Sequence, residues 1–187
     1  DSTGHGNEEV LMRAYGKQYW PIREFEQEQG REFKHIFLPV GTGATISGLM
    51  ASISEGCEVD EPRKQIHGIS IARPAERVRA DIRAFLGSCG YDTPTCLSIA
   101  DVTDAYVGGG YGKPLGSDGG SISPVHALIG EMMQKHGLPL DPVYTGKAYY
   151  GMLQEIDRLH LSGDVLFLHT GGLPLYMDHM ISMRTAI

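Results

Sequence analysis

The chain has 187 residues and a formal net charge of -7 at pH 7, with 41% hydrophobic and 21% charged residues. These values are ordinary for a globular domain. The acidic balance and the lack of a Lys/Arg stripe disfavour a nucleic-acid binder, and no apolar run approaches the roughly 18 residues of a membrane span. The sparse cysteines, Cys57, Cys89 and Cys96, predict reduced thiols in a cytoplasmic protein rather than a secreted disulfide framework.

The first third of the chain is predicted to form a helix, a buried strand and a second helix. Residues 7–29 read as one helix, with Asn7 placed to cap it and Pro21 placed to bend or interrupt it. The apolar run 35–40 predicts a buried strand, and small and apolar residues at helical spacing predict a helix over 44–54.

The middle of the chain continues this alternation. A β-rich run over 65–72 predicts a strand, and 74–86 predicts a charged helix. Residues 96–108 predict a short strand or extended segment that leads into a glycine-rich loop at 108–120.

The last third has clear helix punctuation. Ser123 is placed to cap a helix that has Pro124 at its first position and Gly137 after its end. Residues 144–159 predict another helix, and 164–172 an apolar strand that ends in glycines. Strands alternating with helices predict an α/β fold: a mostly parallel twisted sheet with helices on both faces.

Two glycine-rich loops, at 41–45 and 170–172, follow directly after predicted strands. Ligands of parallel sheets bind beyond the carboxyl ends of the strands. We therefore expect these two loops to face one crevice.

The loop at 41–45 predicts either a tight turn or a phosphate site at a helix N-terminus. It has no Gly-Lys-Ser/Thr, and Ile46 stands where GxGxxG needs its third glycine, so nucleotide motifs are excluded. A run of backbone N–H groups remains, with hydroxyls at Thr42 and Thr45. Such a nest suits a phosphate dianion.

Two tyrosines stand out beside these loops. Tyr111 lies between Gly110 and Gly112, a setting that favours either a ligand contact or a plug for the loop. Tyr144 and Thr145 precede a predicted helix, which taken alone indicates a capped helix with aromatic core contacts. The eight histidines show no metal-ligand spacing, so no metal site is expected.

Four segments together resemble one known family. They are "VGTGATISGL" at 40–49, "GGGYGKP" at 108–114, "DPVYTGKAYYGM" at 141–152 and "DVLFLHTGGLPLY" at 164–176. They resemble, in order, segments of D-cysteine desulfhydrases and 1-aminocyclopropane-1-carboxylate deaminases, which are pyridoxal-phosphate enzymes of the tryptophan-synthase-β-like fold, or fold type II. The resemblance implies pyridoxal 5'-phosphate as cofactor and the large domain of such an enzyme as fold.

The resemblance also implies residue roles. The backbone of Gly43, Ala44 and Thr45, with the hydroxyl of Thr42 beside it, would hold the cofactor phosphate. A second set would face the pyridine ring and the substrate. In it, Tyr144 would lie against the ring and take part in substrate chemistry, and Tyr111 would be the second active-site tyrosine.

By the same resemblance, Thr145 and Thr170 complete the cofactor-binding set, and they also bear on the substrate. The deaminases carry Glu where Thr145 stands and Leu where Thr170 stands, whereas the desulfhydrases carry Thr at both positions. The resemblance therefore favours β-elimination of D-cysteine to pyruvate, ammonia and sulfide. The alternatives are deaminase-type activity on an aminocyclopropane carboxylate and a catalytically incomplete fragment.

The chain departs from the family in two respects. The Gly-Asn-Lys-like segment with the Schiff-base lysine and the Ser-Asn-His-like segment after it have no counterpart here, and "PLGSDGGSIS" replaces an acidic sequence after the tyrosine loop. The chain also starts without Met. We therefore expect residues 1–187 to be a single domain, the C-terminal large-domain portion of a longer two-domain homodimeric enzyme. Its partners would be a small amino-acid substrate and the missing N-terminal half.

Overall fold

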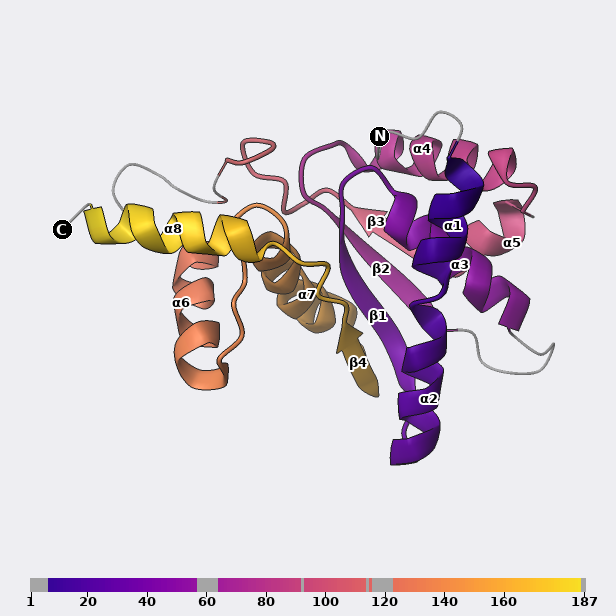
Figure 1. Cartoon of the computed structure of the whole chain (residues 1–187), viewed down its shortest axis with the longest axis horizontal. Coiled ribbons are helices and arrows are strands. Elements are labelled where there is room, and N and C mark those ends of the chain that lie inside the picture. Colours follow the sequence, from indigo (N-terminus) through magenta and orange to yellow (C-terminus); the bar gives the residue numbers. More distant parts are fainter. Residues whose placement is uncertain (1–6, 57–63, 92, 114, 116–122, 186–187) are drawn as a thin grey trace.

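The computed structural model describes residues 7–56, 64–91, 93–113, 115 and 123–185. A four-stranded sheet lies at its centre (Figure 1). The strands are β1 (Phe33–Val40), β2 (Gln65–Ser70), β3 (Ala100–Thr103) and β4 (Asp164–Phe167), in the order β3-β2-β1-β4. Every neighbouring pair is parallel, so the carboxyl ends of all four strands lie at one edge. This confirms the predicted α/β class.

One face of the sheet is covered by α1 (Glu8–Gly16), α3 (Ala44–Gly56), α4 (Ala75–Ser88) and the short α5 (Thr93–Leu97). The helix α3 buries Ile46, Leu49 and Ile53 in this layer. It approaches α1 so closely that a Cβ on Gly48 would lie 2.7 Å from the Cβ of Tyr15. Glycine has no Cβ, and its absence at position 48 lets the two helices pack this closely.

The opposite face is covered by α7 (Thr145–Leu159), which packs on β1 and β2. Phe37 and Ile69 from the strands form a buried cluster with Ala148 and Met152 from α7. Helices therefore lie on both faces, as the alternating pattern predicts.

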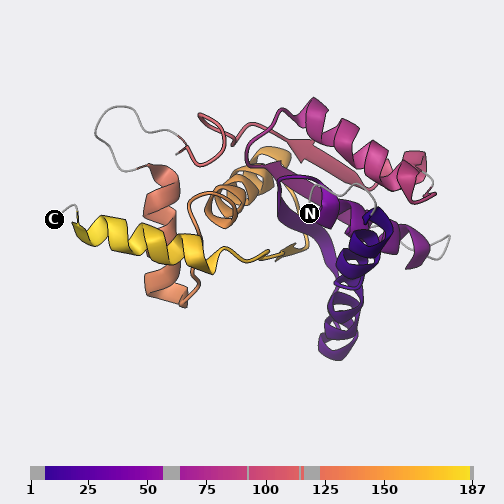
Figure 2. The same cartoon turned by 45° about the horizontal axis from the view of Figure 1, so that its top comes forward.

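The remaining helices lie at the two ends of the molecule. Both views show α8 (Leu173–Thr185) crossing α6 (Pro124–His136), away from α1 and α2 (Tyr19–Gln29) (Figures 1 and 2). Tyr176 of α8 is buried against Val125, Ile129 and Met132 of α6. The sequence gives α8 no clear helix pattern, and neither it nor α5 was predicted.

Some details of the predicted elements are wrong. The single helix over 7–29 is two helices, α1 and α2, separated at Lys17 and Gln18. The break precedes Pro21, which lies in the first turn of α2, where a backbone N–H has no helical partner to lose. Asn7 stands at the start of α1, but its side chain makes no capping hydrogen bond.

The punctuation of α6 is confirmed except for the side-chain cap, since the helix begins at Pro124 as predicted. Gly137 ends the helix in the left-handed conformation, with φ 64°. Ser123 stands at the N-cap, yet its hydroxyl donates to the carbonyl of Leu115 (2.6 Å) and does not cap the helix.

Two absences hold for the described residues. No helix among them is both long and apolar enough to cross a membrane. Within the same residues, no group of three or more His, Cys, Asp or Glu side chains is placed to hold a metal ion.

Candidate functional site

A cavity of about 390 Å³ opens at the edge of the sheet where the parallel strands end. This size lies within the range of about 300–1,000 Å³ that is usual for small-ligand pockets. The residues that line it come from the ends of β1 and β2, the start of α3, the tyrosine loop, and the segment before and into α8: Pro39, Gly41, Thr42, Thr45, Ile71, Ala72, Arg73, Tyr111, Tyr144, Thr170, Gly171, Gly172 and Leu175. The two glycine loops therefore face one crevice, as the strand-edge rule predicts.

The first wall is the N-terminus of α3. The backbone N–H groups of a first helical turn have no partner within the helix, and the helix dipole adds partial positive charge there. Gly43 makes the entry with φ 90°, and a Cβ on it would lie 3.0 Å from Cγ1 of Ile82. The turn is fixed from behind, since the hydroxyl of Ser47 donates to the Gly43 carbonyl (2.8 Å). This wall suits an anion such as a phosphate group.

The second wall carries the two tyrosines. Their hydroxyl oxygens are 2.7 Å apart, and their rings meet edge to face with centroids 5.8 Å apart. The hydrogen bond with Tyr111, together with burial, raises the pKa of Tyr144 to about 12. At neutral pH, Tyr144 is therefore protonated in this arrangement and can donate a hydrogen bond. It has none of the pKa lowering that a tyrosine base would need.

The floor of the cavity is built around Asp141, which is fully buried. One carboxylate oxygen accepts the backbone N–H groups of Val143 (2.8 Å) and Tyr144 (2.7 Å). The other accepts the backbone N–H (2.9 Å) and the hydroxyl (2.6 Å) of Thr145. A carboxylate at a helix N-terminus satisfies donors that the helix leaves unpaired. Asp141 thus fixes the start of α7 and the direction of Tyr144.

This arrangement places Thr145 behind the cavity and not in its lining. Thr145 is fully buried, and its hydroxyl donates to Asp141 while it accepts the Asp141 backbone N–H (2.8 Å). The proton of the hydroxyl is therefore committed to Asp141. One lone pair remains for any further partner.

The loop from His169 to Gly172 closes the cavity from the β4 side. His169 holds the loop, because its Nε2 donates to the carbonyl of Pro139 (3.0 Å) and its Nδ1 accepts the N–H of Gly171 (3.3 Å). Gly172, with φ 102°, lies directly against the carboxylate of Asp141, so a Cβ there would collide with Oδ2. Thr170, by contrast, is exposed and faces the cavity.

Arg73 is a cavity residue that the sequence did not point to. It follows β2, and its guanidinium is paired with Asp81 (2.9 Å) while its side chain keeps 43% of its surface exposed. The strand-edge rule applies to the end of β2 as well as to the glycine loops, and it would have found Arg73. A guanidinium here adds a positive group suited to a phosphate or a carboxylate.

The chain is similar to curated proteins of one kind. A Pyrococcus abyssi protein named "Putative 1-aminocyclopropane-1-carboxylate deaminase" is 29% identical over 164 residues, which are 87% of this chain and 45% of that protein. D-cysteine desulfhydrase of Yersinia enterocolitica is 30% identical over 146 residues, 76% of this chain and 41% of that enzyme. The chain thus spans about half the length of the curated relatives it matches. No protein-family model matches the chain.

A solved structure agrees with these relatives. The crystal structure of an ACC deaminase homologue superposes with a TM-score of 0.67 and 27% sequence identity, covering 91% of this chain and 49% of that one. Over the half of their length that it spans, the chain is similar in sequence and structure to ACC deaminases and D-cysteine desulfhydrases. The expected resemblance to this family is thereby confirmed.

The positions that the family resemblance assigns are brought together, and their roles stay predictions. The side chains that line the cavity are those of Thr42, Thr45, Tyr111, Tyr144 and Thr170. Three others lie directly behind it: Gly43, Ala44 and Thr145 are buried. Most of the departure at 114–123 lies outside the described residues.

The two neighbouring glycines of the 169–172 loop allow a matched test of the contact with Asp141. Gly171 and Gly172 share a positive φ (105° and 102°), but only at Gly172 does an added Cβ meet atoms within 4 Å. Both alanine variants carry backbone strain, and Gly172→Ala adds overpacking worth about 1–3 kcal/mol. Urea unfolding should therefore give Gly172→Ala the lower free energy of unfolding, and equal values for the two would contradict the contact.

A second prediction concerns the tyrosine pair. Because the hydrogen bond with Tyr111 is the largest cause of the raised pKa of Tyr144, Tyr111→Phe should lower that pKa from about 12 towards the ordinary value of about 10. The titration is followed by NMR of ring-labelled tyrosine. Tyr15→Phe is the control and should leave Tyr144 unchanged. A Tyr144 pKa unaffected by Tyr111→Phe would show that the two hydroxyls do not meet.

Proposed function

We propose that this chain holds the cofactor of a pyridoxal-phosphate lyase that acts on a small amino acid, with β-elimination of D-cysteine as the reaction. The observation that carries the proposal is the cavity itself. It has a phosphate-type helix N-terminus on one wall and a hydrogen-bonded tyrosine pair on the other. The relatives that the chain resembles include D-cysteine desulfhydrases.

The phosphate end of the cofactor fits the wall made by α3. The N–H groups of Gly43, Ala44 and Thr45 belong to the turn that enters this helix, and the Thr42 and Thr45 side chains reach the cavity. A dianion there would gain hydrogen bonds and the favourable end of the helix dipole. Arg73 lies on the same cavity and would add charge complementarity.

The ring end of the cofactor would lie towards Tyr144 and Thr170. When bound, pyridoxal phosphate supplies the electron sink for removing a Cα proton, and the protein orients the reacting groups. Tyr144, protonated and hydrogen-bonded to Tyr111, would act as a hydrogen-bond donor to the substrate. Expulsion of a β-thiol needs less help than ring opening, because the thiol leaves readily as thiolate.

The choice of D-cysteine over an aminocyclopropane carboxylate depends on Thr145 and Thr170. Sequence identity does not separate the two activities, since relatives with either name are about equally similar. Threonine at both positions matches the desulfhydrase pattern described above. The side chain of Thr145 adds a physical reason. Its hydroxyl donates to Asp141 and, unlike a glutamate at this position, brings no carboxylate of its own to a ring nitrogen.

The lysine that would carry the cofactor comes, we propose, from another part of a longer enzyme. None of the described residues that line the cavity is a lysine. Lys147 is near, but its ammonium is bound to backbone carbonyls. We therefore infer that residues 1–187 form the large-domain portion of a two-domain enzyme that functions as a homodimer.

The role of the phosphate wall is tested on this chain with two ligands. Pyridoxal 5'-phosphate should bind more tightly than pyridoxal, because only the former carries the dianion. Thr45→Val should weaken pyridoxal phosphate about tenfold, the cost of one hydrogen bond to a charged group, and leave pyridoxal unchanged. Thr45→Ser should restore binding. Titration calorimetry measures each of these affinities, and equal affinities of the unaltered chain for the two ligands would contradict this wall as a phosphate site.

The reaction is tested on the complete protein that contains this chain. Incubation with D-cysteine should release sulfide and pyruvate, whereas an aminocyclopropane carboxylate should give little 2-oxobutanoate. Exchanging Thr145→Glu together with Thr170→Leu should shift the product ratio towards 2-oxobutanoate by at least about tenfold, equivalent to some 1.4 kcal/mol. Release of neither product by the wild-type protein would refute the proposed function.

A further inference from the structure

A buried lysine lies beneath the tyrosine pair and has no place in the function described so far. Lys147, in the first turn of α7, is fully buried. Its Nζ donates to the carbonyls of Val107 (2.8 Å) and Gly110 (3.0 Å), and more weakly to that of Ile71 (3.5 Å). An ammonium has three N–H donors, so these three carbonyls match it in number.

The partners of this ammonium are unusual for a buried charge. Buried cations are normally paired with carboxylates. Among the described residues, the hydrogen-bond acceptors of Lys147 are all backbone carbonyls. Burial also lowers the pKa of Lys147. A group so costly to bury indicates a specific geometric task.

Two of the three carbonyls belong to the loop that carries Tyr111. Gly108, Gly110 and Gly112 all have positive φ (64°, 110° and 67°), which turns the backbone tightly around the ammonium. The hydrogen bonds within the loop join residues close in sequence and have long N···O distances, such as 3.4 Å from the Gly110 N–H to the Val107 carbonyl. Its tip is exposed, with 61% of the surface of Tyr111 accessible.

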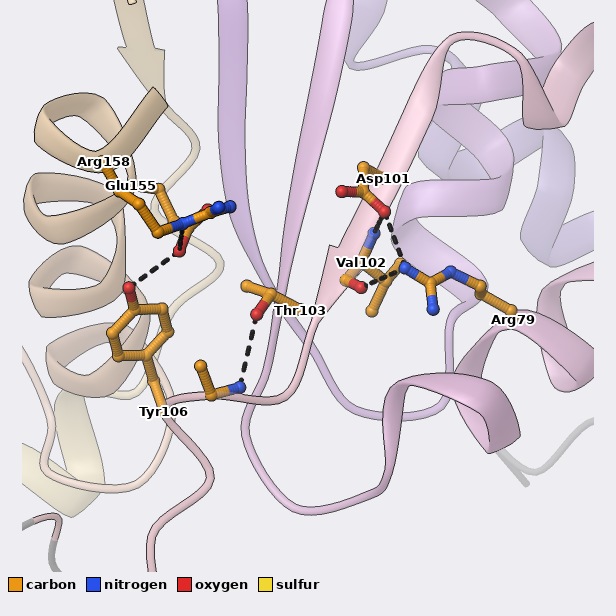
Figure 3. A network of polar contacts seen from close by, with 8 residues as sticks. Arg79, Asp101, Val102, Thr103, Tyr106, Glu155 and Arg158 are labelled. Atoms are coloured by element: carbon orange, nitrogen blue, oxygen red, sulfur yellow. Dashed lines mark hydrogen bonds and ion pairs between the residues drawn. The ribbon is translucent and has the colours of Figure 1, made fainter. Parts of the chain in front are cut away.

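A second contact with α7 holds only the residues that precede this loop. Figure 3 shows Tyr106 pointing towards α7, where its hydroxyl donates to Glu155 (2.8 Å), which is paired in turn with Arg158. The Ala105 N–H donates to the Thr103 hydroxyl (3.3 Å). The same figure shows the link from Arg79 to Asp101 on β3. These contacts anchor the chain before residue 107. Beyond it, the described hydrogen bonds between the loop and the start of α7 are those of the Lys147 ammonium and that of the tyrosine pair itself.

We propose that the Lys147 ammonium, seated in this cage of three carbonyls, is the positioning group that holds Tyr111 against Tyr144 over the cavity. Tyr144 stands three residues before Lys147 on the same helix start. The start of α7 therefore carries Tyr144 directly and, through Lys147, holds the loop that carries Tyr111. The inference rests on loop geometry alone and is tested without cofactor, so its failure and a failure of pyridoxal-phosphate binding are distinguishable.

The cage is tested by removing the ammonium and supplying it again. Lys147→Met should lower the pKa of Tyr144 from about 12 towards about 10, because Tyr111 moves away. Amide hydrogens of residues 107–113 should exchange at least about tenfold faster, a loss of about 1.4 kcal/mol of local protection. In Lys147→Ala, added ammonium or methylammonium should restore both readouts, whereas tetramethylammonium at equal ionic strength should not.

A pair of glycine variants keeps the test decisive if the lysine variants do not fold. Gly110 (φ 110°) and Gly90 (φ 77°) both have open space where a Cβ would be added, so alanine brings only backbone strain at either position. Gly110→Ala should turn a cage carbonyl away and reproduce the Tyr144 shift, and Gly90→Ala should not. The proposal is overturned if Gly110→Ala leaves the Tyr144 pKa and loop exchange unchanged, or if Lys147→Met folds and changes neither.

Discussion

Four hydrogen-bond donors converge on the buried carboxylate of Asp141, and the arrangement of the cavity depends on that meeting point. The carboxylate supplies acceptors to the otherwise unpaired N–H groups at the start of α7. It thereby fixes the direction in which Tyr144 leaves the helix and orients the hydroxyl of Thr145. Gly172 packs on the same carboxylate, so the loop after β4 is positioned by it too.

The parallel sheet turns these local constraints into one site. Because all strands end at the same edge, the α3 N-terminus, the end of β2 and the loop after β4 meet there although they are far apart in sequence. The helix α7 then serves as a common platform. It presents Tyr144, and through Lys147 it holds the loop of Tyr111. A polar, partly charged binding surface is thus built on rigid elements, which favours precise orientation of a ligand.

What could be predicted from the sequence was local or followed from the sheet. Residues 35–51 were predictable as strand, turn and helix start, because glycine and apolar spacing act over a few residues. The meeting of the two glycine loops followed from the strand-edge rule. The same rule covers the segment after β2, which has no glycine motif to mark it, and Arg73 was therefore not predicted as a cavity residue. The break at Lys17 and Gln18 was misplaced at Pro21, since a proline in a first helical turn breaks nothing.

What could not be predicted depends on contacts distant in sequence. The raised pKa of Tyr144 arises from Tyr111, 33 residues away along the chain. Lys147 looks like an ordinary surface lysine of an amphipathic helix until the loop at 107–110 closes over it. The surroundings of Thr145 likewise depend on tertiary contacts, because its hydrogen-bond partner Asp141 packs against Gly172 from the loop after β4. The sequence pattern predicts which element holds such residues, whereas their pKa values and hydrogen-bond partners depend on tertiary packing.

The central claim is that the N-terminus of α3 is a phosphate site for pyridoxal phosphate. Its most direct measurement is the backbone amide spectrum of the ¹⁵N-labelled chain, recorded as pyridoxal 5'-phosphate is added. The account predicts the largest shifts at the amides of Gly43, Ala44 and Thr45, with smaller ones at Thr170 and Gly171, and weaker shifts at the same amides with inorganic phosphate. Shifts confined to other parts of the chain, or none at saturating ligand, would contradict it.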